Sequence, residues 1–158
     1  MGVAAMPSAA VLAVCTGAAV PFARGSLSGV HKTPVQGRVR VTAQGLQGDA
    51  QGDLRLHGGV EKAVHHYPQE HYAAWRAELG AHALLEAPGA FGENLHSRGL
   101  TEATVCLGDR WRVGDVLLEV TQARQPCWKL NERFGVPDMA RRVQQSQRTG
   151  WYSRVVED

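Results

Sequence analysis

The stretch Thr121-Gln-Ala-Arg-Gln-Pro-Cys-Trp-Lys-Leu-Asn131 places a thiol where a strand passes into a helix. The apolar run before it, Val116-Leu-Leu-Glu-Val120, is typical of a buried strand. The residues after it predict a short helix that ends near Gly135. Between the two, Pro126 removes one backbone donor and restricts the turn. A cysteine is therefore held at a defined junction between two elements.

Cys127 is the candidate functional residue of this junction. A helix N-terminus and nearby cations both favour the thiolate form, and three basic residues surround it in sequence: Arg124, Lys129 and Arg133. A thiolate attacks electrophiles and binds soft metals. The alternative is an inert buried cysteine, because free cysteine is among the most buried residue types.

Length and composition limit the possible classes of protein. The 158 residues fit one domain, and 44% hydrophobic and 20% charged residues are ordinary for a soluble globular protein. The 18 glycines, many in turn signals, favour many short strands over a helical bundle. A net charge of +2 argues against binding to nucleic acid or to a membrane surface.

The three cysteines, Cys15, Cys106 and Cys127, are widely spaced and form no C-x-x-C pair. A structural zinc site and a disulfide framework are therefore disfavoured. We expect the protein to be located in a reducing cytoplasm. We expect Cys15 and Cys106 to be core residues. The run Ala9–Cys15 lacks the positive region that precedes a signal peptide, since the first basic residue is Arg24, and we interpret it as a buried strand. No apolar run is long enough to cross a bilayer.

The hydrophobic pattern predicts a mainly β protein with a few helices. We expect strands at 9–15, 35–42, 63–67, 108–113, 116–120 and 150–156, with a loop at 20–28. We expect a helix from Pro68, as its first residue, to Leu79, where Gly80 ends it, and another at 137–147. His65, His66 and His71 do not form a metal-binding helix pattern, and we interpret them as surface or satisfied hydrogen-bonding residues.

Glycine turns are the second group of candidate sites. The adjacent glycines of His57-Gly-Gly59 can aim successive backbone N–H groups at one anion and so form a nest, and Lys62 adds positive charge. The alternative is a loop whose glycines only permit positive φ. In Phe91-Gly-Glu-Asn94, a carboxylate and an amide beside a glycine suit recognition of a heterocycle. The alternative there is a turn held by the Asn94 side chain.

Eight blocks in order resemble the MOSC domain, the molybdenum cofactor sulfurase C-terminal family, and its bacterial YiiM-like branch. They span nearly the whole chain: Lys32–Val35, Gly45–Asp49, His57–Val64, Tyr67–Tyr72, Phe91–Leu95, Gly108-Asp109, Pro126–Leu130 and Gly150-Trp151. Each block alone is a weak signal, whereas eight in the family's order are specific.

The resemblance implies a MOSC-type β-barrel that binds a pterin-based molybdenum cofactor, with Cys127 as the catalytic residue and molybdenum ligand. It also implies reduction of N-hydroxylated compounds, such as hydroxylaminopurines or amidoximes, with electrons from a separate reductase. No pyridoxal phosphate is expected in this chain. Together with the glycine turns and cations, the resemblance gives these cofactor-binding candidates: Lys32, His57, Gly58, Gly59, Lys62, Gly92, Glu93, Asn94, Arg124, Lys129 and Asn131.

One departure from the family concerns the C-terminus. Relatives continue past the block at 150–155 into a further strand, whereas this sequence stops at Asp158. We therefore expect a single MOSC domain over 1–158 without that closing strand and extension. An uncovered sheet edge favours homodimerisation or aggregation.

Three functions remain open from the sequence. The first is a molybdenum-dependent reductase. The second is a cofactor- or sulfur-carrying module with no turnover of its own. The third is a thiol enzyme in which Cys127 attacks carbon or sulfur with a histidine as base.

Overall fold

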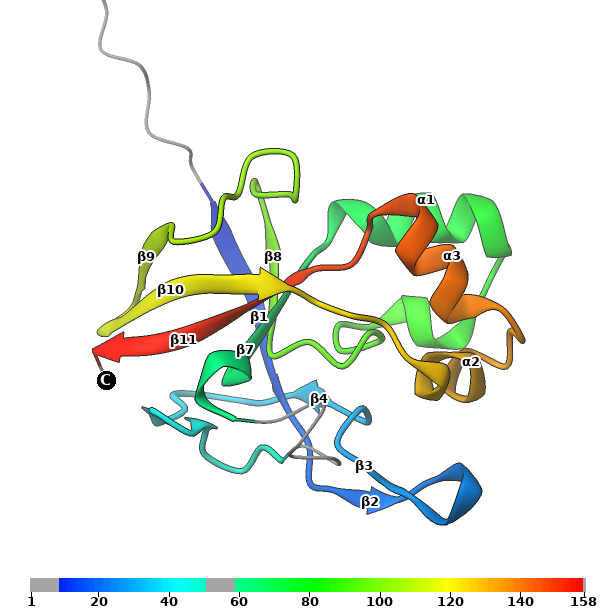
Figure 1. Cartoon of the computed structure of the whole chain (residues 1–158), viewed down its shortest axis with the longest axis horizontal. Coiled ribbons are helices and arrows are strands. Elements are labelled where there is room, and N and C mark those ends of the chain that lie inside the picture. Colours follow the sequence, from blue (N-terminus) through cyan, green and yellow to red (C-terminus); the bar gives the residue numbers. More distant parts are fainter. Residues whose placement is uncertain (1–8, 51–58, 158) are drawn as a thin grey trace, which may run out of the picture.

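The protein is mainly β, as predicted, and its main sheet has seven strands. The structure, a computed structural model, describes residues 9–50 and 59–157. In spatial order the strands are β4 (Thr33–Pro34), β1 (Ala10–Thr16), β8 (Leu95–Arg98), β7 (Val64–Pro68), β11 (Trp151–Glu157), β10 (Val116–Ala123) and β9 (Arg110–Val113). Only β7 and β8 are parallel among these neighbours. The sheet curls into a half barrel with β4 and β9 at its edges (Figure 1).

Two short hairpins extend the fold below the main sheet in Figure 1. The first pairs β2 (Val20–Pro21) with β3 (Leu27–Ser28) around the 3-10 turn η1 (Ala23–Gly25). The second pairs β5 (Val41–Thr42) with β6 (Gly45–Leu46). Gly45 has φ 116°, and a Cβ there would lie 2.7 Å from the Ala63 carbonyl oxygen. The absence of a side chain at Gly45 therefore lets this hairpin pack against the segment that leads into β7.

Three helices lie together on one side of the sheet (Figure 1). They are α1 (Glu70–Leu79), α2 (Trp128–Phe134) and α3 (Met139–Ser146), with further 3-10 turns η2 (Val60–Lys62) and η3 (Ala83–Glu86). None of the helices in residues 9–50 and 59–157 has the length and apolarity that a bilayer crossing requires.

An aromatic core fills the space between the helices and the sheet. Tyr67 and Phe91 stack with ring centroids 4.1 Å apart, and Trp75 lies beside them. The Trp75 indole N–H donates to the Tyr67 hydroxyl (2.8 Å), which donates in turn to the Arg148 carbonyl (2.8 Å). Stacked aromatic pairs contribute about 0.5–1.5 kcal/mol beyond the area they bury. This core therefore fixes β7, which carries Tyr67, against the turn that carries Phe91.

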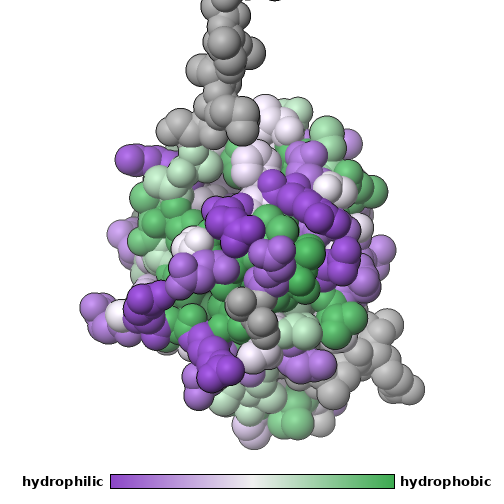
Figure 2. Space-filling view, turned by 90° about the vertical axis from the view of Figure 1, so that its left-hand side faces the viewer, coloured by the Kyte–Doolittle hydropathy of each residue, from purple (hydrophilic) through white to green (hydrophobic). Residues whose placement is uncertain are grey.

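A second cluster is aliphatic and fills the other part of the half barrel. Its buried members are Leu46, Ala63, Val64, Leu95 and Leu118. A groove lined mostly by valines and leucines opens beside it, with the exposed Arg38–Asp115 ion pair (2.8 Å) among its lining residues. Figure 2 shows hydrophobic surface in the middle of the corresponding side of the molecule, bordered by hydrophilic residues.

Most of the predicted elements are present. β1, β7, β9, β10 and β11 occupy the predicted strand ranges to within three residues at each end. α1 ends at Leu79 before Gly80, which has φ 80°, and α3 lies inside the predicted range 137–147.

Three predicted elements differ from the structure. The predicted strand at 35–42 is reduced to Val41–Thr42, because no neighbouring strand pairs with 35–40, although Val39 still packs against the aliphatic cluster. Pro68 ends β7 instead of beginning α1, because it pairs with Ser97. The predicted loop at 20–28 contains the β2–β3 hairpin.

Two predictions of burial were wrong. Cys106 is exposed rather than in the core, because it belongs to the surface turn that Asp109 closes by accepting the Cys106 backbone N–H (2.8 Å). His65 is buried rather than exposed, and its Nε2, which makes no hydrogen bond of normal geometry among the described residues, lies against the Thr149–Gly150 backbone. His66 is also buried, but its Nε2 is bonded to the Ser97 hydroxyl, and His71 Nε2 lies 2.7 Å from Glu102.

Gly150 supplies a test of this packing. It has φ 71°, and a Cβ there would collide with the His66 carbonyl oxygen and come within 2.9 Å of the Tyr67 ring. Gly114 also has positive φ (58°) but has open space around it. We expect Gly114→Ala to lower the free energy of unfolding by about 1 kcal/mol through backbone strain. Gly150→Ala should cost about 1–3 kcal/mol more, because it adds overpacking. Urea denaturation measures both, and equal losses would contradict the close packing at Gly150.

Candidate functional site

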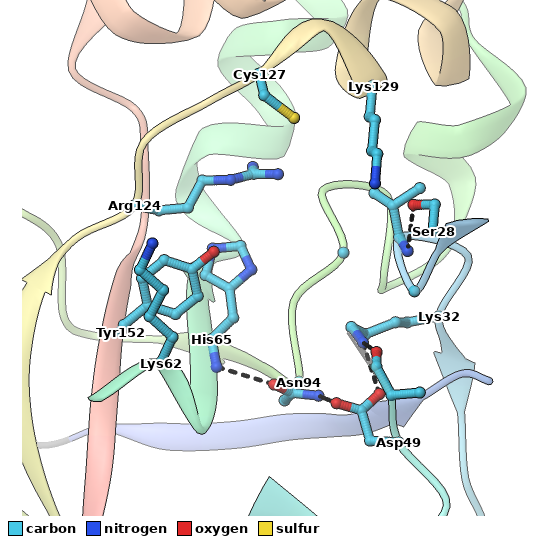
Figure 3. A pocket seen from close by; sticks show the side chains of 14 residues that line it. Ser28, Lys32, Asp49, Lys62, His65, Asn94, Arg124, Cys127, Lys129 and Tyr152 are labelled. Atoms are coloured by element: carbon cyan, nitrogen blue, oxygen red, sulfur yellow. Dashed lines mark hydrogen bonds and ion pairs between the residues drawn. The ribbon is translucent and has the colours of Figure 1, made fainter. Parts of the chain in front are cut away.

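A pocket opens beside the connection between β10 and α2 (Figure 3). It holds about 530 Å³, including the part that is open to solvent. Its lining residues come from six separate parts of the chain: Ser28, Gly29, Val30, Lys32, Asp49, Ala50, Lys62, His65, Gly92, Asn94, Arg124, Cys127, Lys129 and Tyr152.

Cys127 lies at this pocket as the N-cap of α2. Its backbone is extended (φ −132°, ψ 175°), its thiol is half-buried and bonds to no backbone amide of the helix, and α2 ends at Gly135 in the left-handed conformation. The strand-to-helix junction is thus placed where the sequence predicts it. Of the other cysteines, neither lines the pocket. Burial raises the pKa of the Cys15 thiol to about 12, so Cys15 stays protonated.

The floor of the pocket is organised by the Asn94 side chain (Figure 3). Its Oδ1 accepts the His65 backbone N–H (2.9 Å). Its Nδ2 donates to the Cys15 carbonyl (3.1 Å) and to Asp49 Oδ2 (2.9 Å). One amide therefore joins β1, β7 and the turn after β6, which are separate in sequence. These bonds favour the alternative in which the Asn94 side chain holds the turn by bonding to backbone atoms.

A buried ion pair forms one wall. Lys32 Nζ lies 2.6 Å from Asp49 Oδ1, and the two side chains are only 7% and 6% exposed. Lys32 also donates to the Ala50 carbonyl (3.2 Å), and the Gly17 N–H donates to Asp49 (3.0 Å).

Lys129, on α2, is likewise satisfied within the protein. Its Nζ donates to the Leu27 carbonyl (2.7 Å), which attaches the β2–β3 hairpin to α2. Lys32 and Lys129, two of the four cationic side chains that line the pocket, thus donate to oxygens of the protein.

The remaining cations, Arg124 and Lys62, lie on the opposite side with His65 and Tyr152 (Figure 3). Arg124 is 8% exposed, and its Nη1 has no hydrogen-bond partner among the described residues. Burial, reinforced by the charge of Arg124, lowers the pKa of His65 well below its ordinary value. The imidazole is therefore neutral near pH 7. Burial also raises the pKa of Tyr152, against the charge of Arg124, and Lys62 Nζ lies 5.6 Å from the Tyr152 ring centroid.

The structure brings together seven of the residues that the sequence singled out. They are Lys32, Lys62, Gly92, Asn94, Arg124, Cys127 and Lys129. Gly59, Glu93 and Asn131 do not line the pocket. His57 and Gly58 lie outside the described residues.

Glu93 and Asn131 have structural partners instead. Glu93 is fully buried, accepts the Tyr72 hydroxyl (2.6 Å) and the Phe91 N–H (3.0 Å), and lies 3.0 Å from His96 Nδ1. Asn131 Oδ1 accepts the Ala140 N–H (2.7 Å) and so joins α2 to α3. Gly59 is exposed, with φ 97°.

Sequence reasoning missed four polar lining residues: Ser28, Asp49, His65 and Tyr152. The sequence could have indicated Asp49 and Tyr152, because Asp49 is the last residue of the Gly45–Asp49 block of the family resemblance and Tyr152 directly follows the Gly150-Trp151 block. His65 carried none, because β7 is buried along its whole length and alternation within it does not separate a surface face from a core face.

A bare metal ion has no ready-made cage in the part of the chain that the structure describes. Residues 9–50 and 59–157 contain no group of three or more His, Cys, Asp or Glu side chains placed to hold one. A metal at Cys127 would therefore need to arrive with most of its ligands supplied by another molecule.

Comparison with known proteins agrees with this fold. The MOSC domain model matches residues 53–158. The chain belongs to the MOSC domain family. It is 41% identical over 143 residues to protein YiiM of Escherichia coli (strain K12), covering 90% of this chain and 64% of YiiM. This confirms the predicted YiiM-like branch.

Two further relatives extend the comparison of this MOSC chain. It is 42% identical over 131 residues to a protein named reductase from Gibberella moniliformis (strain M3125 / FGSC 7600), covering 82% of this chain and 23% of that protein. The crystal structure of YiiM from Geobacillus stearothermophilus matches with a TM-score of 0.76 at 33% identity, covering 95% of this chain and 69% of that one. The chain spans less than two thirds of the length of both curated relatives.

The Lys32–Asp49 pair provides a test of the pocket wall. We expect Asp49→Asn to lower the free energy of unfolding by about 3–5 kcal/mol, because it leaves Lys32 buried without its counter-charge. Asp115→Asn is the matched control, since the Arg38–Asp115 side chains are 92% and 83% exposed. The control should change stability by less than about 1 kcal/mol.

A double-mutant cycle with Lys32→Met completes this test. The double variant should lose clearly less stability than the sum of the two single losses. Additive losses would show that the buried pair is not coupled.

Proposed function

We propose that this MOSC chain binds a pterin-based molybdenum cofactor in the pocket, with Cys127 as the molybdenum ligand. We further propose that it reduces N-hydroxylated compounds, such as hydroxylaminopurines and amidoximes, to the amines. The observation that carries the proposal is the half-buried Cys127 thiol beside a pocket lined by four cationic side chains and one carboxylate.

The donor set fits this cofactor. A soft thiolate suits molybdenum, and a single protein ligand suffices when a pterin supplies further ligands. The cationic side chains suit a phosphate-bearing molecule. Gly92 lets the chain pack closely against Val30 in the pocket wall, because it has φ 76° and a Cβ there would lie 3.0 Å from the Val30 side chain.

The bound cofactor supplies the two-electron chemistry of the reaction RNHOH + 2e⁻ + 2H⁺ → RNH₂ + H₂O. The protein's own contribution is to hold the cofactor in place and to shield it from solvent. Asn94 and the Lys32–Asp49 pair hold the pocket walls. The part of the pocket open to solvent admits the substrate. Electrons come from a separate reductase, and the relative named reductase supports an oxidoreductase role.

The thiol-enzyme alternative receives less support. His65 is the histidine that lines the pocket in the described residues. Its Nε2 has no hydrogen-bond partner there, so it forms no hydrogen bond with Cys127. A nucleophilic cysteine is normally within hydrogen-bond reach of its base.

Loss of the thiol should separate metal binding from folding. We expect Cys127→Ala, produced in a host that makes the cofactor, to retain no molybdenum but to keep the wild-type melting temperature to within a few degrees, because Cys127 is only half-buried. Cys106→Ala is the matched control, since Cys106 is exposed and does not line the pocket, and it should retain molybdenum. Metal analysis of the purified proteins gives the answer. A full molybdenum complement in Cys127→Ala would refute the ligand assignment.

Turnover tests the reaction itself. We expect the molybdenum-loaded chain to reduce 6-hydroxylaminopurine to adenine with an artificial electron donor, with product measured by chromatography. Cys127→Ala protein from the same host and the cofactor-free protein are controls. A chain that holds molybdenum but shows no turnover with either hydroxylaminopurine or an amidoxime would leave the carrier module as the function.

A further inference from the structure

The β2–β3 hairpin, residues 20–28, lies outside the main sheet but leads directly into the pocket. Within the described residues, β2 and β3 pair only with each other. A two-stranded hairpin alone is marginally stable in water, so the position of this one depends on its contacts with the rest of the protein. Its last residue, Ser28, and the two that follow, Gly29 and Val30, line the pocket. The placement of the hairpin therefore determines where this part of the pocket wall lies.

Lys129 forms the contact between the hairpin and the pocket. It lines the pocket, is 7% exposed, and donates from its amine to the Leu27 carbonyl (2.7 Å). Leu27 does not line the pocket and is 52% exposed, so the bond lies between the pocket and the outer surface of the hairpin. Figure 3 shows the Lys129 side chain directed from α2 toward the segment that carries Ser28. Because Cys127 is the N-cap of the same helix, this bond sets the spacing between the thiol and the wall.

The tip of the hairpin makes a second contact with α2. The Arg24 guanidinium lies 4.4 Å from the centroid of the Trp128 ring and 3.9 Å from the Glu132 carboxylate. Arg24 has φ 62°, which costs free energy for a residue other than glycine and persists where surrounding contacts fix it. The Phe22 ring, 6.0 Å from that of Trp128, also packs against the aromatic core. The hairpin is therefore held to α2 both at its tip and at β3.

The wall formed by residues 28–30 has little freedom of its own. The Ser28 hydroxyl accepts the Val30 N–H (3.0 Å), and both residues are buried. On the other side, Val30 packs so closely against Gly92 that a Cβ there would lie 3.0 Å from its side chain. A wide molecule is therefore accommodated by moving the hairpin away from α2 rather than by reshaping the wall.

We propose that the β2–β3 hairpin limits the size of the molecule that reaches Cys127, and that Lys129 is the positioning residue that holds the hairpin against α2. The proposal deepens the proposed function and rests on it only for the identity of the molecule that enters. Access to the Cys127 thiol is a property of the protein alone and requires no molybdenum.

Alkylation of Cys127 in the full, cofactor-free chain tests this proposal. All proteins carry Cys106→Ser, which leaves Cys127 as the accessible thiol, because Cys15 is fully buried. N-ethylmaleimide is the small reagent and N-(1-pyrenyl)maleimide the large one. Both carry the same reactive group and no charge. The ratio of the large-reagent to the small-reagent rate constant therefore reports access, and changes in the reactivity of the thiol cancel.

Three variants separate the hairpin contacts from charge alone. Lys129→Met should raise the rate ratio by about ten- to a hundredfold, because a bond from a charged donor is lost. Arg24→Gln should raise it by about two- to fivefold, the scale of an exposed cation–π contact. Arg38→Gln, the control, removes a charge from an exposed ion pair that does not line the pocket and should leave the ratio unchanged.

Two measurements accompany the alkylation rates. Mass spectrometry verifies that Cys127 is the modified residue, and melting temperatures verify that each variant is folded. If Lys129→Met does not fold, Arg24→Gln carries the test, because Arg24 is exposed. A wild-type rate ratio in the folded hairpin variants would overturn the proposal, and so would an equal rise in Arg38→Gln.

Substrate selectivity links the hairpin to the proposed reaction. In the molybdenum-loaded chain, Lys129→Met should raise kcat/KM for a bulky aryl amidoxime relative to that for acetamidoxime. A chain without turnover refutes the proposed reaction, whereas the alkylation ratios still establish the role of the hairpin. Turnover of both amidoximes together with wild-type alkylation ratios in Lys129→Met and Arg24→Gln supports the reaction and overturns the role of the hairpin.

Discussion

The pocket depends on one buried amide. The Asn94 side chain accepts from the His65 backbone and donates to the Cys15 carbonyl and to Asp49. It thereby fixes β1, β7 and the turn after β6 to one another, at a point where β1 and β7 are separated in the sheet by β8. Because Asp49 also holds Lys32, the bonds of Asn94 extend into the buried ion pair. A fully satisfied buried network of this kind rigidifies a structure, whereas a partly satisfied one lowers its stability.

Above this floor, the polar groups of the pocket divide by what they contact. On one side the charged groups bond to the protein itself. The Lys32 amine donates to Asp49 and to the Ala50 carbonyl, and the Lys129 amine donates to the Leu27 carbonyl. On the other side, Arg124 Nη1 makes no hydrogen bond of normal geometry among the described residues. Cys127 lies between the two sides at the N-cap of α2 (Figure 3). This asymmetry distinguishes groups that build the pocket from a group that remains available to a ligand.

Local sequence signals predicted local features of this protein well. The Cys127 junction, the end of α1 at Gly80 and the strands on either side of Gly114 all follow from apolar runs, proline and glycine. The strand predicted at 35–42 failed because pairing requires a partner, and only Val41–Thr42 finds one, in β6. The burial of His65 could not be predicted because β7 is covered on both faces, by the aromatic core and by the aliphatic cluster.

The composition of the pocket was accessible only in part. Sequence blocks pointed to Lys32, Gly92, Asn94 and Cys127 as one site, but they could not show that Glu93 turns away to Tyr72 while its neighbour Asn94 faces the pocket. The lysine nearest Cys127 in sequence, Lys129, was one of the predicted cofactor-binding residues, yet its amine donates to the Leu27 carbonyl, over 100 residues away in the chain. Such long-range partners decide which cations are available, and no local pattern encodes them.

The central claim is that this pocket holds molybdenum on the Cys127 sulfur. Anomalous diffraction at the molybdenum edge, from crystals of the cofactor-loaded chain, tests it most directly. We expect one molybdenum peak inside the pocket, bonded to Cys127 Sγ. A molybdenum peak elsewhere in the molecule, or one in the pocket without a bond to Cys127, would contradict it.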